Sequence, residues 1–151
     1  MKRVIKLFFV FLILLSITGC AAKKKKLEPE AFKTALQEEG FKVKDATSEM
    51  IYDYIVQIYL ASSTNYNIEY YEIRNNDLAA GFYKNNVEAI EKINYDEQKA
   101  VIDEASNYSK YTIILDNKYK VVSRVDNTVI FINAPSRYKE NIDIILNKIG
   151  Y

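Results

Sequence analysis

The chain has 151 residues and a nearly balanced charge, with 21 Lys and Arg against 20 Asp and Glu. It contains no His and only one Cys, so the usual general base and any intramolecular disulfide are absent. This composition excludes most hydrolase and metalloenzyme templates, because they depend on a His or on a free thiol.

The N-terminal residues have the pattern of an export signal. Three basic residues lie within residues 1–6, and an uncharged run rich in Leu, Ile, Val and Phe follows at 7–17. This run has roughly half of the about 20 apolar residues that a membrane-spanning helix needs. The pattern predicts a signal peptide over residues 1–19 rather than a permanent span.

The end of this segment places an aliphatic Ile17 and the small Thr18 and Gly19 directly before Cys20. The tetrapeptide resembles the lipobox of bacterial lipoproteins. The resemblance implies that Cys20 is diacylated, becomes the mature N-terminus and anchors the protein on the outer face of the cytoplasmic membrane. Two acyl chains anchor a protein stably, whereas one holds it only marginally. The alternative is an ordinary cleaved signal with an incidental cysteine.

Four lysines at 23–26 and Leu27 complete a predicted tether over residues 20–27. A tether of about seven residues reaches at most about 25 Å, so the domain is expected close to the bilayer. The lysines either pair with anionic head groups, at about 1 kcal/mol each, or form a solvated spacer.

Residues 28–151 are predicted to form one domain, because a chain of this length can bury about two-thirds of its surface. From Leu27 onward, 14 Lys and Arg stand against all 20 Asp and Glu. This negative balance argues against nonspecific binding to nucleic acid.

The apolar pattern predicts an α+β domain with the element order α-β-β-α-β-β-β-α. Three segments have an apolar stripe at helical spacing with capping residues, and these predicted helices lie at 28–40, 75–93 and 135–150. Five segments have strand composition or alternation, and these predicted strands lie at 50–60, 66–73, 108–115, 119–125 and 128–132.

Two stretches are less clearly patterned. Residues 41–45 are either a short strand or the exit from the first helix, and residues 94–107 are either a loop or a short helical turn. The short links at 116–117 and 126–127 require an antiparallel meander. Because each helix has a single apolar stripe, we expect an antiparallel sheet of about five strands with all helices on one face. The other face is then open or partly covered.

The sequence predicts no catalytic, cofactor-binding or metal-ligating residue. The four glycines are scattered too widely for a phosphate-binding loop or a dinucleotide fingerprint. Adjacent carboxylates occur in three pairs, but neighbours on a helix point about 100° apart, so a solvated surface is the preferred interpretation. These pairs are Glu38–Glu39, Asp96–Glu97 and Asp103–Glu104.

Tyrosine is the one unusual enrichment, with 13 residues and a concentration between 52 and 71. Core packing is the preferred interpretation of this enrichment, and a binding platform for a peptide or glycan is the alternative. Tyr59 and Tyr71 are predicted to be the more exposed of these tyrosines.

Alternation in 119–125 places Lys120 and Arg124 on the open sheet face. With Glu69 and Tyr71 they form a speculative binding face, for which a plain solvated surface is the alternative.

These features predict a non-enzymatic binding or accessory module that contacts a membrane protein, a wall component or a secreted peptide. One alternative is an enzyme that uses carboxylates, Lys or Tyr on wall polymers or peptides. Another is an immunity-type lipoprotein that protects its own cell by occupancy. The stretches SRVDNT at 123–128 and KIGY at 148–151 are similar to small lipoproteins of low-GC Gram-positive, clostridia-like bacteria, a resemblance that implies no activity.

Overall fold

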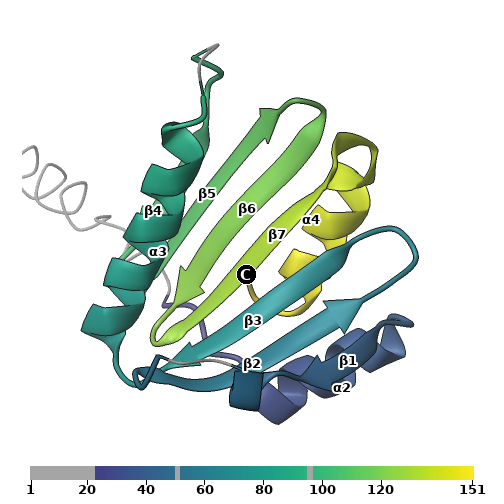
Figure 1. Ribbon diagram of the computed structural model, residues 1–151, viewed down its shortest axis with the longest axis vertical. Helices are drawn as coiled ribbons and strands as arrows, with labels where there is room; N and C mark the ends of the chain where they lie inside the picture. Colours follow the sequence, from purple (N-terminus) through teal and green to yellow (C-terminus); the bar gives the residue numbers. More distant parts are fainter. Residues whose placement is uncertain (1–22, 50–51, 95–96) are drawn as a thin grey trace, which may run out of the picture.

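The computed structural model describes residues 23–49, 52–94 and 97–151 (Figure 1). The predicted signal peptide and Cys20 therefore lie outside the described residues. In the described part of the chain, no helix is both long and apolar enough to cross a membrane. The α-helices of this part are α2 (Pro29–Glu38), α3 (Asn76–Glu91) and α4 (Lys139–Lys148). Its strands are β1 (Lys42–Asp45), β2 (Ile55–Ser62), β3 (Asn67–Ile73), β4 (Val101–Ala105), β5 (Tyr108–Leu115), β6 (Lys118–Val125) and β7 (Thr128–Pro135).

The helix ends follow the predicted capping chemistry. Pro29 opens α2, and the Asn75 side chain caps α3 by accepting a 2.9 Å hydrogen bond from a backbone N–H of the first turn. Gly40 and Gly150 follow α2 and α4 with φ angles of 84° and 88°, which glycine adopts without strain. Local sequence signals therefore decide where α2 and α3 begin and where α2 and α4 end.

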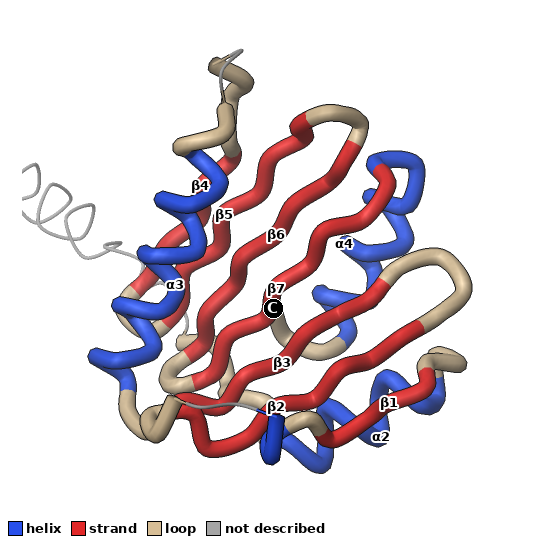
Figure 2. The backbone as a smooth tube through the Cα atoms, in the orientation of Figure 1, coloured by secondary structure: helices blue, strands red, loops and turns tan. Residues whose placement is uncertain are grey.

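The strands form one antiparallel sheet in the order β1-β2-β3-β7-β6-β5-β4 (Figure 2). This confirms the α+β class and the meander of β5, β6 and β7. Asp116 and Asn117, between β5 and β6, have φ angles of 48° and 58°, the left-handed conformation that suits a two-residue hairpin. The pairing of β3 with β7, in which Tyr70 lies opposite Ile130, joins the N-terminal strands to the meander.

The sheet has seven strands rather than about five, and both additional strands lie at its edges. β1 falls in the ambiguous stretch 41–45, whereas β4 lies in 94–107, where a loop or helical turn was expected. All of β4 except Ala105 is exposed, so it has no alternation of buried and exposed positions that could have indicated a strand. Pro135 closes β7 instead of opening the last helix, which begins at Lys139 after a 3₁₀ turn.

The helices cover both faces of the sheet, so the prediction of a single covered face is wrong. α2 and α4 pack on one face through Phe32 and Leu146, and α3 packs on the other through Tyr83. Figure 1 shows α3 in front of the sheet with α2 and α4 behind it. The cause lies in the central strands, because Val121 and Val122 of β6 are both fully buried on opposite faces. We name the two surfaces the α2/α4 face and the α3 face.

The tyrosines at 59, 66 and 70 are buried on the α2/α4 face, which confirms the core interpretation for them. Tyr59 was expected to be exposed and is only 3% exposed. Its hydroxyl donates a hydrogen bond to Glu30 at the surface of α2, and the Tyr66 hydroxyl donates to Asn141 Oδ1 at 2.5 Å. A ring can therefore lie in the core while its hydroxyl reaches a polar partner near the rim.

Candidate functional site

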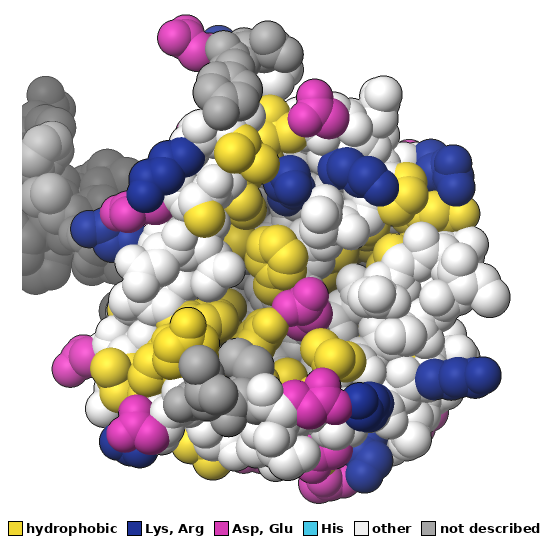
Figure 3. Space-filling view, viewed as in Figure 1, with side chains coloured by type: hydrophobic (Ala, Val, Ile, Leu, Met, Phe, Trp, Pro, Cys, Tyr) yellow, Lys and Arg dark blue, Asp and Glu magenta, His cyan; other side chains and the backbone are white. Residues whose placement is uncertain are grey.

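The four residues of the speculative binding face lie on the α3 face but not in one cluster. Glu69 and Tyr71 belong to β3, Lys120 and Arg124 belong to β6, and β7 runs between these two strands. Neighbouring strands are about 4.8 Å apart, so the two pairs are separated by roughly 10 Å of sheet. Figure 3 shows this face, with apolar side chains at its centre, an acidic side chain among them and basic side chains above.

Each of these side chains has a local partner. Tyr71 donates a hydrogen bond to Glu69 Oε2 at 2.5 Å, and burial together with this bond raises the pKa of Tyr71. Lys120 Nζ donates to the Asn133 side chain at 3.4 Å. Arg124 Nη1 donates to the carbonyl of Asp126 at 3.1 Å, which anchors the adjacent turn. The structure therefore places these residues on one face, which α3 partly covers, and does not bring them together around one ligand.

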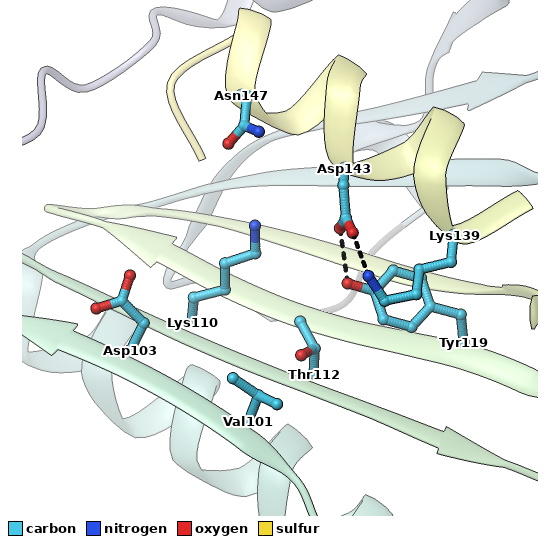
Figure 4. Close-up of a pocket in the computed structure, with 8 residues that line it drawn as sticks. All are labelled: Val101, Asp103, Lys110, Thr112, Tyr119, Lys139, Asp143 and Asn147. Carbon is cyan, nitrogen blue, oxygen red and sulfur yellow. Dashed lines mark hydrogen bonds and ion pairs between the residues drawn. The ribbon is translucent and has the colours of Figure 1, made fainter.

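A cleft of about 340 Å³ lies on the opposite side of the sheet, between α4 and the strands β4, β5 and β6 (Figure 4). α4 covers the centre of the sheet here, and β4 with the outer half of β5 extends beyond it. Lys110 and Thr112, which point toward this face from β5, are therefore only partly buried and line the cleft. The cleft is lined by Val101, Asp103, Lys110, Thr112, Tyr119, Lys139, Asp143 and Asn147.

The α4 wall of the cleft is fixed by a hydrogen-bonded carboxylate. Tyr119 donates to Asp143 Oδ1 at 2.7 Å, and Lys139 Nζ donates to Asp143 Oδ2 at 2.6 Å. Burial and the bond to Asp143 raise the pKa of Tyr119, so its hydroxyl stays protonated at neutral pH and remains a donor. Lys139 and Tyr119 thus use both oxygens of Asp143 and hold this wall in one geometry.

Lys110 is the unusual residue of the cleft. It occupies an inward-facing position of β5, is partly buried, and forms no hydrogen bond or salt bridge with any residue that the structure describes. Burial lowers the pKa of its ammonium, and Asp143 opposes this shift without cancelling it. Figure 4 shows the side chain rising from β5 toward α4, where Asp143 and Asn147 face it.

Sequence reasoning did not identify this cleft, because its residues come from four elements, β4, β5, β6 and α4, whose arrangement in space no local pattern shows. One signal was present: Lys110 interrupts a strand in which Tyr108, Thr112 and Ile114 occupy the same side. A lysine at a position that alternation assigns to the core indicates either a functional group or the edge of the covered area.

The arrangement combines two ammonium groups with two carboxylates and neutral hydrogen-bonding side chains, which suits a small polar ligand. Among residues 23–49, 52–94 and 97–151, no three Asp, Glu or Cys side chains come close enough to hold a metal ion. Comparisons with known proteins gave no match to any protein-family model, curated protein or solved structure. Function is therefore inferred from the sequence pattern and from the geometry.

The segment after the predicted lipidation site is docked on the domain. Lys24 donates its backbone N–H to Asn107 Oδ1 at 3.1 Å, and Asn107 Nδ2 donates back to the Lys24 carbonyl at 2.7 Å. Further along, the Leu27 carbonyl accepts a hydrogen bond from the Tyr70 hydroxyl at 2.8 Å. We name residues 24–28 the N-terminal strap. The part of the predicted tether that can act as a free spacer is correspondingly shorter.

Ionic contacts add to the docking of the strap. Lys26 Nζ lies 3.1 Å from Glu72 and 3.3 Å from Glu28. Burial lowers the pKa of Lys26, but the hydrogen bonds with Glu72 and Glu28 outweigh it and raise the pKa overall. The Lys24 ammonium lies 4.3 Å from the centre of the Tyr108 ring, within the range of a cation–π contact. Two of the strap lysines, Lys24 and Lys26, therefore contact the domain itself.

Proposed function

We propose that the protein is an exported lipoprotein, anchored through diacylated Cys20 on the outer face of the cytoplasmic membrane, where it acts as a non-catalytic binding or accessory module. The lipobox-like residues before Cys20 support the anchor. The docked N-terminal strap is the observation that supports action at the membrane surface, because it limits how far the domain can move from Cys20.

The sequence distance sets the limit. Only three residues separate Cys20 from Lys24, so the four Cα–Cα steps span at most about 15 Å. The turn that carries Asn107 then lies close to the lipid head groups. Lys23 and Lys25 are exposed beside it and are free to meet anionic lipids, at about 1 kcal/mol each.

The same short span supports a position of the cleft near the membrane. The Lys24 ammonium lies over the Tyr108 ring, and Tyr108 is on the same side of β5 as Lys110, so the strap runs beside the cleft. A module held in this way meets molecules at the membrane surface, such as a membrane protein, a wall component or a secreted peptide.

Membrane fractionation tests the anchor. The wild-type protein is expected in the membrane fraction with a lipid-modified N-terminus by mass spectrometry, and Cys20→Ala is expected to be soluble with an unchanged circular dichroism spectrum. Cys20→Ala is expected to keep its fold because residue 20 precedes every element that the structure describes. An unmodified N-terminus on the membrane-associated wild-type protein would contradict the lipid anchor.

Crosslinking in intact cells, followed by mass spectrometry, tests the module. A specific partner should crosslink to the wild type and be lost in Cys20→Ala. Asn107→Ala serves as a matched variant, because it keeps the anchor and removes both strap hydrogen bonds of Lys24. Absence of any partner, or turnover of wall polymers by the purified protein, would contradict the accessory role.

A further inference from the structure

We infer that the cleft between α4 and β4–β6 binds a small zwitterion, in which one molecule carries both a carboxylate and an ammonium group, such as an amino acid or a short peptide. This inference rests on the proposed binding function and names its ligand. The observation that supports it is the position of Lys110 between Asp103 of β4 and Asp143 of α4.

The carboxylate of the ligand belongs at Lys110. This ammonium has lost part of its hydration and has no partner among the described residues, so a bound carboxylate would supply the missing charge and hydrogen bonds. Asn147 faces the same space from α4 and its side-chain amide can donate to the second carboxylate oxygen. Lys139 is already bound to Asp143 and is the weaker candidate.

The ammonium of the ligand belongs at Asp103. Asp103 of β4 lies directly opposite Lys110 of β5 in the antiparallel register, yet the two charged groups do not form a salt bridge. In Figure 4, the Lys110 ammonium rises toward α4, whereas the Asp103 carboxylate stays near the neighbouring strand β4. A ligand that carries both charges can bridge the two side chains, which do not reach each other.

The charge balance of the cleft separates a zwitterion from a simple anion. Among the residues that line the cleft, Lys110 and Lys139 are matched by Asp103 and Asp143, and Lys24 of the strap adds one positive charge beside them. Phosphate, with about two negative charges, would approach both carboxylates and be repelled by them. Asp103 interacts with the Tyr108 hydroxyl, but a carboxylate without an ammonium group would leave its negative charge without a cationic partner.

The size of the site and its apolar side favour a ligand with an aliphatic portion. The volume of about 340 Å³ is within the lower range of small-molecule sites. A second recess of about 180 Å³ shares Val101, Thr112, Tyr119 and Lys139 with the cleft. Its other lining residues are the aliphatic Ile113 and Ile114 and the polar Gln98 and Lys99. An aliphatic side chain of the ligand can extend into this recess.

Calorimetric titration of the full-length protein in detergent tests the inference. The probes are leucine, the dipeptide leucylglycine, 4-methylpentanoate, 3-methylbutylamine and inorganic phosphate. Saturable binding is expected for leucine, for leucylglycine or for both, and the stronger of the two identifies a free amino acid or a peptide end. The two singly charged analogues and phosphate should bind at least about tenfold more weakly, because each leaves a charged group of the site unpaired.

Two variants and one control locate the binding. Lys110→Met and Asp103→Asn should each weaken binding of the zwitterion by at least about tenfold. Met keeps the length and packing of the Lys stem, and Asp103 is exposed, so both variants should fold as the wild type does. Lys120→Met, on the α3 face, is the matched control and should bind normally.

Several outcomes would overturn the inference: no probe binds, phosphate or 4-methylpentanoate binds as tightly as the zwitterions, or Lys110→Met binds like the wild type. These outcomes are distinguishable from failure of the proposed function. If Lys110→Met still crosslinks to the same membrane partner, the accessory module stands and only the zwitterion site is rejected.

Discussion

The two faces of the sheet are covered in different ways. The α2/α4 face carries two helices, the strap and the C-terminal Tyr151, and its central side chains are fully buried. The α3 face carries one helix, and beside it Leu60, Tyr71 and Phe131 remain partly exposed. Open area alone would place the binding site on the α3 face. The cleft nevertheless lies at the border of the better covered face, where inward-facing positions become polar because no helix covers them.

The largest expected effect that tests this comparison is alkaline unfolding. Burial raises the pKa of Tyr66, on the α2/α4 face, to about 12 and the pKa of Tyr83, on the α3 face, to about 12. An unfolded tyrosine loses its proton near pH 10, whereas the folded one keeps it, so stability is present below pH 10 and is lost as the pH rises toward 12. Each such tyrosine removes about 1.4 kcal/mol of folding free energy per pH unit in this window.

Urea unfolding between pH 8 and 12, combined with tyrosinate absorbance, measures this loss. Burial also raises the pKa of Tyr70 and Tyr151 on the α2/α4 face, so most of the loss should come from that face. Tyr66→Phe should reduce the slope of stability against pH. Full ionisation near pH 10 with an intact fold would show that the hydroxyls are not held as the structure places them.

A core truncation in α4 gives the next largest effect. Leu146→Ala should destabilise the protein by about 3 kcal/mol, because the side chain is fully buried on the α2/α4 face and leaves a cavity. Ile144→Ala is the matched control in the same helix, and with 67% of its surface exposed it should cost less than about 0.5 kcal/mol. Equal effects in urea unfolding would mean that α4 does not bury the face assigned to it.

The sequence predicted the parts of this fold that depend on local signals. The caps of α2 and α3 and the turn at Asp116 and Asn117 need only nearby residues, and these elements are confirmed. β4 was missed because an exposed edge strand has no alternation, and it forms through pairing of Asp103 and its neighbours with β5. The coverage of both faces was missed because the full burial of Val121 and Val122 depends on helices that are distant in sequence.

In the candidate site, too, local patterns predicted some features and missed those that depend on distant parts of the chain. Alternation placed Glu69 and Lys120 correctly on one face, but strand order decides how far apart they lie, and no local pattern shows that β7 separates them. The strap was missed for a similar reason. The two hydrogen bonds that hold it join Lys24 to Asn107, which lie 83 residues apart. The Asn107 side-chain amide pairs with the Lys24 backbone in the way that a neighbouring strand would.

The smallest effects come from two adjacent tyrosines of β3 that point to opposite faces. Tyr70→Phe removes the hydrogen bond to the Leu27 carbonyl and should destabilise the protein by about 2 kcal/mol, because the ring is fully buried and the strap loses a contact. Tyr71→Phe removes the bond to Glu69, whose partly exposed carboxylate can turn to water, and should cost less than about 1 kcal/mol. Urea unfolding of both variants at pH 7 measures the difference. A larger loss for Tyr71→Phe would show that the Glu69 pair is closed off from solvent, and the α3 face would then be as well covered as the face that carries the strap.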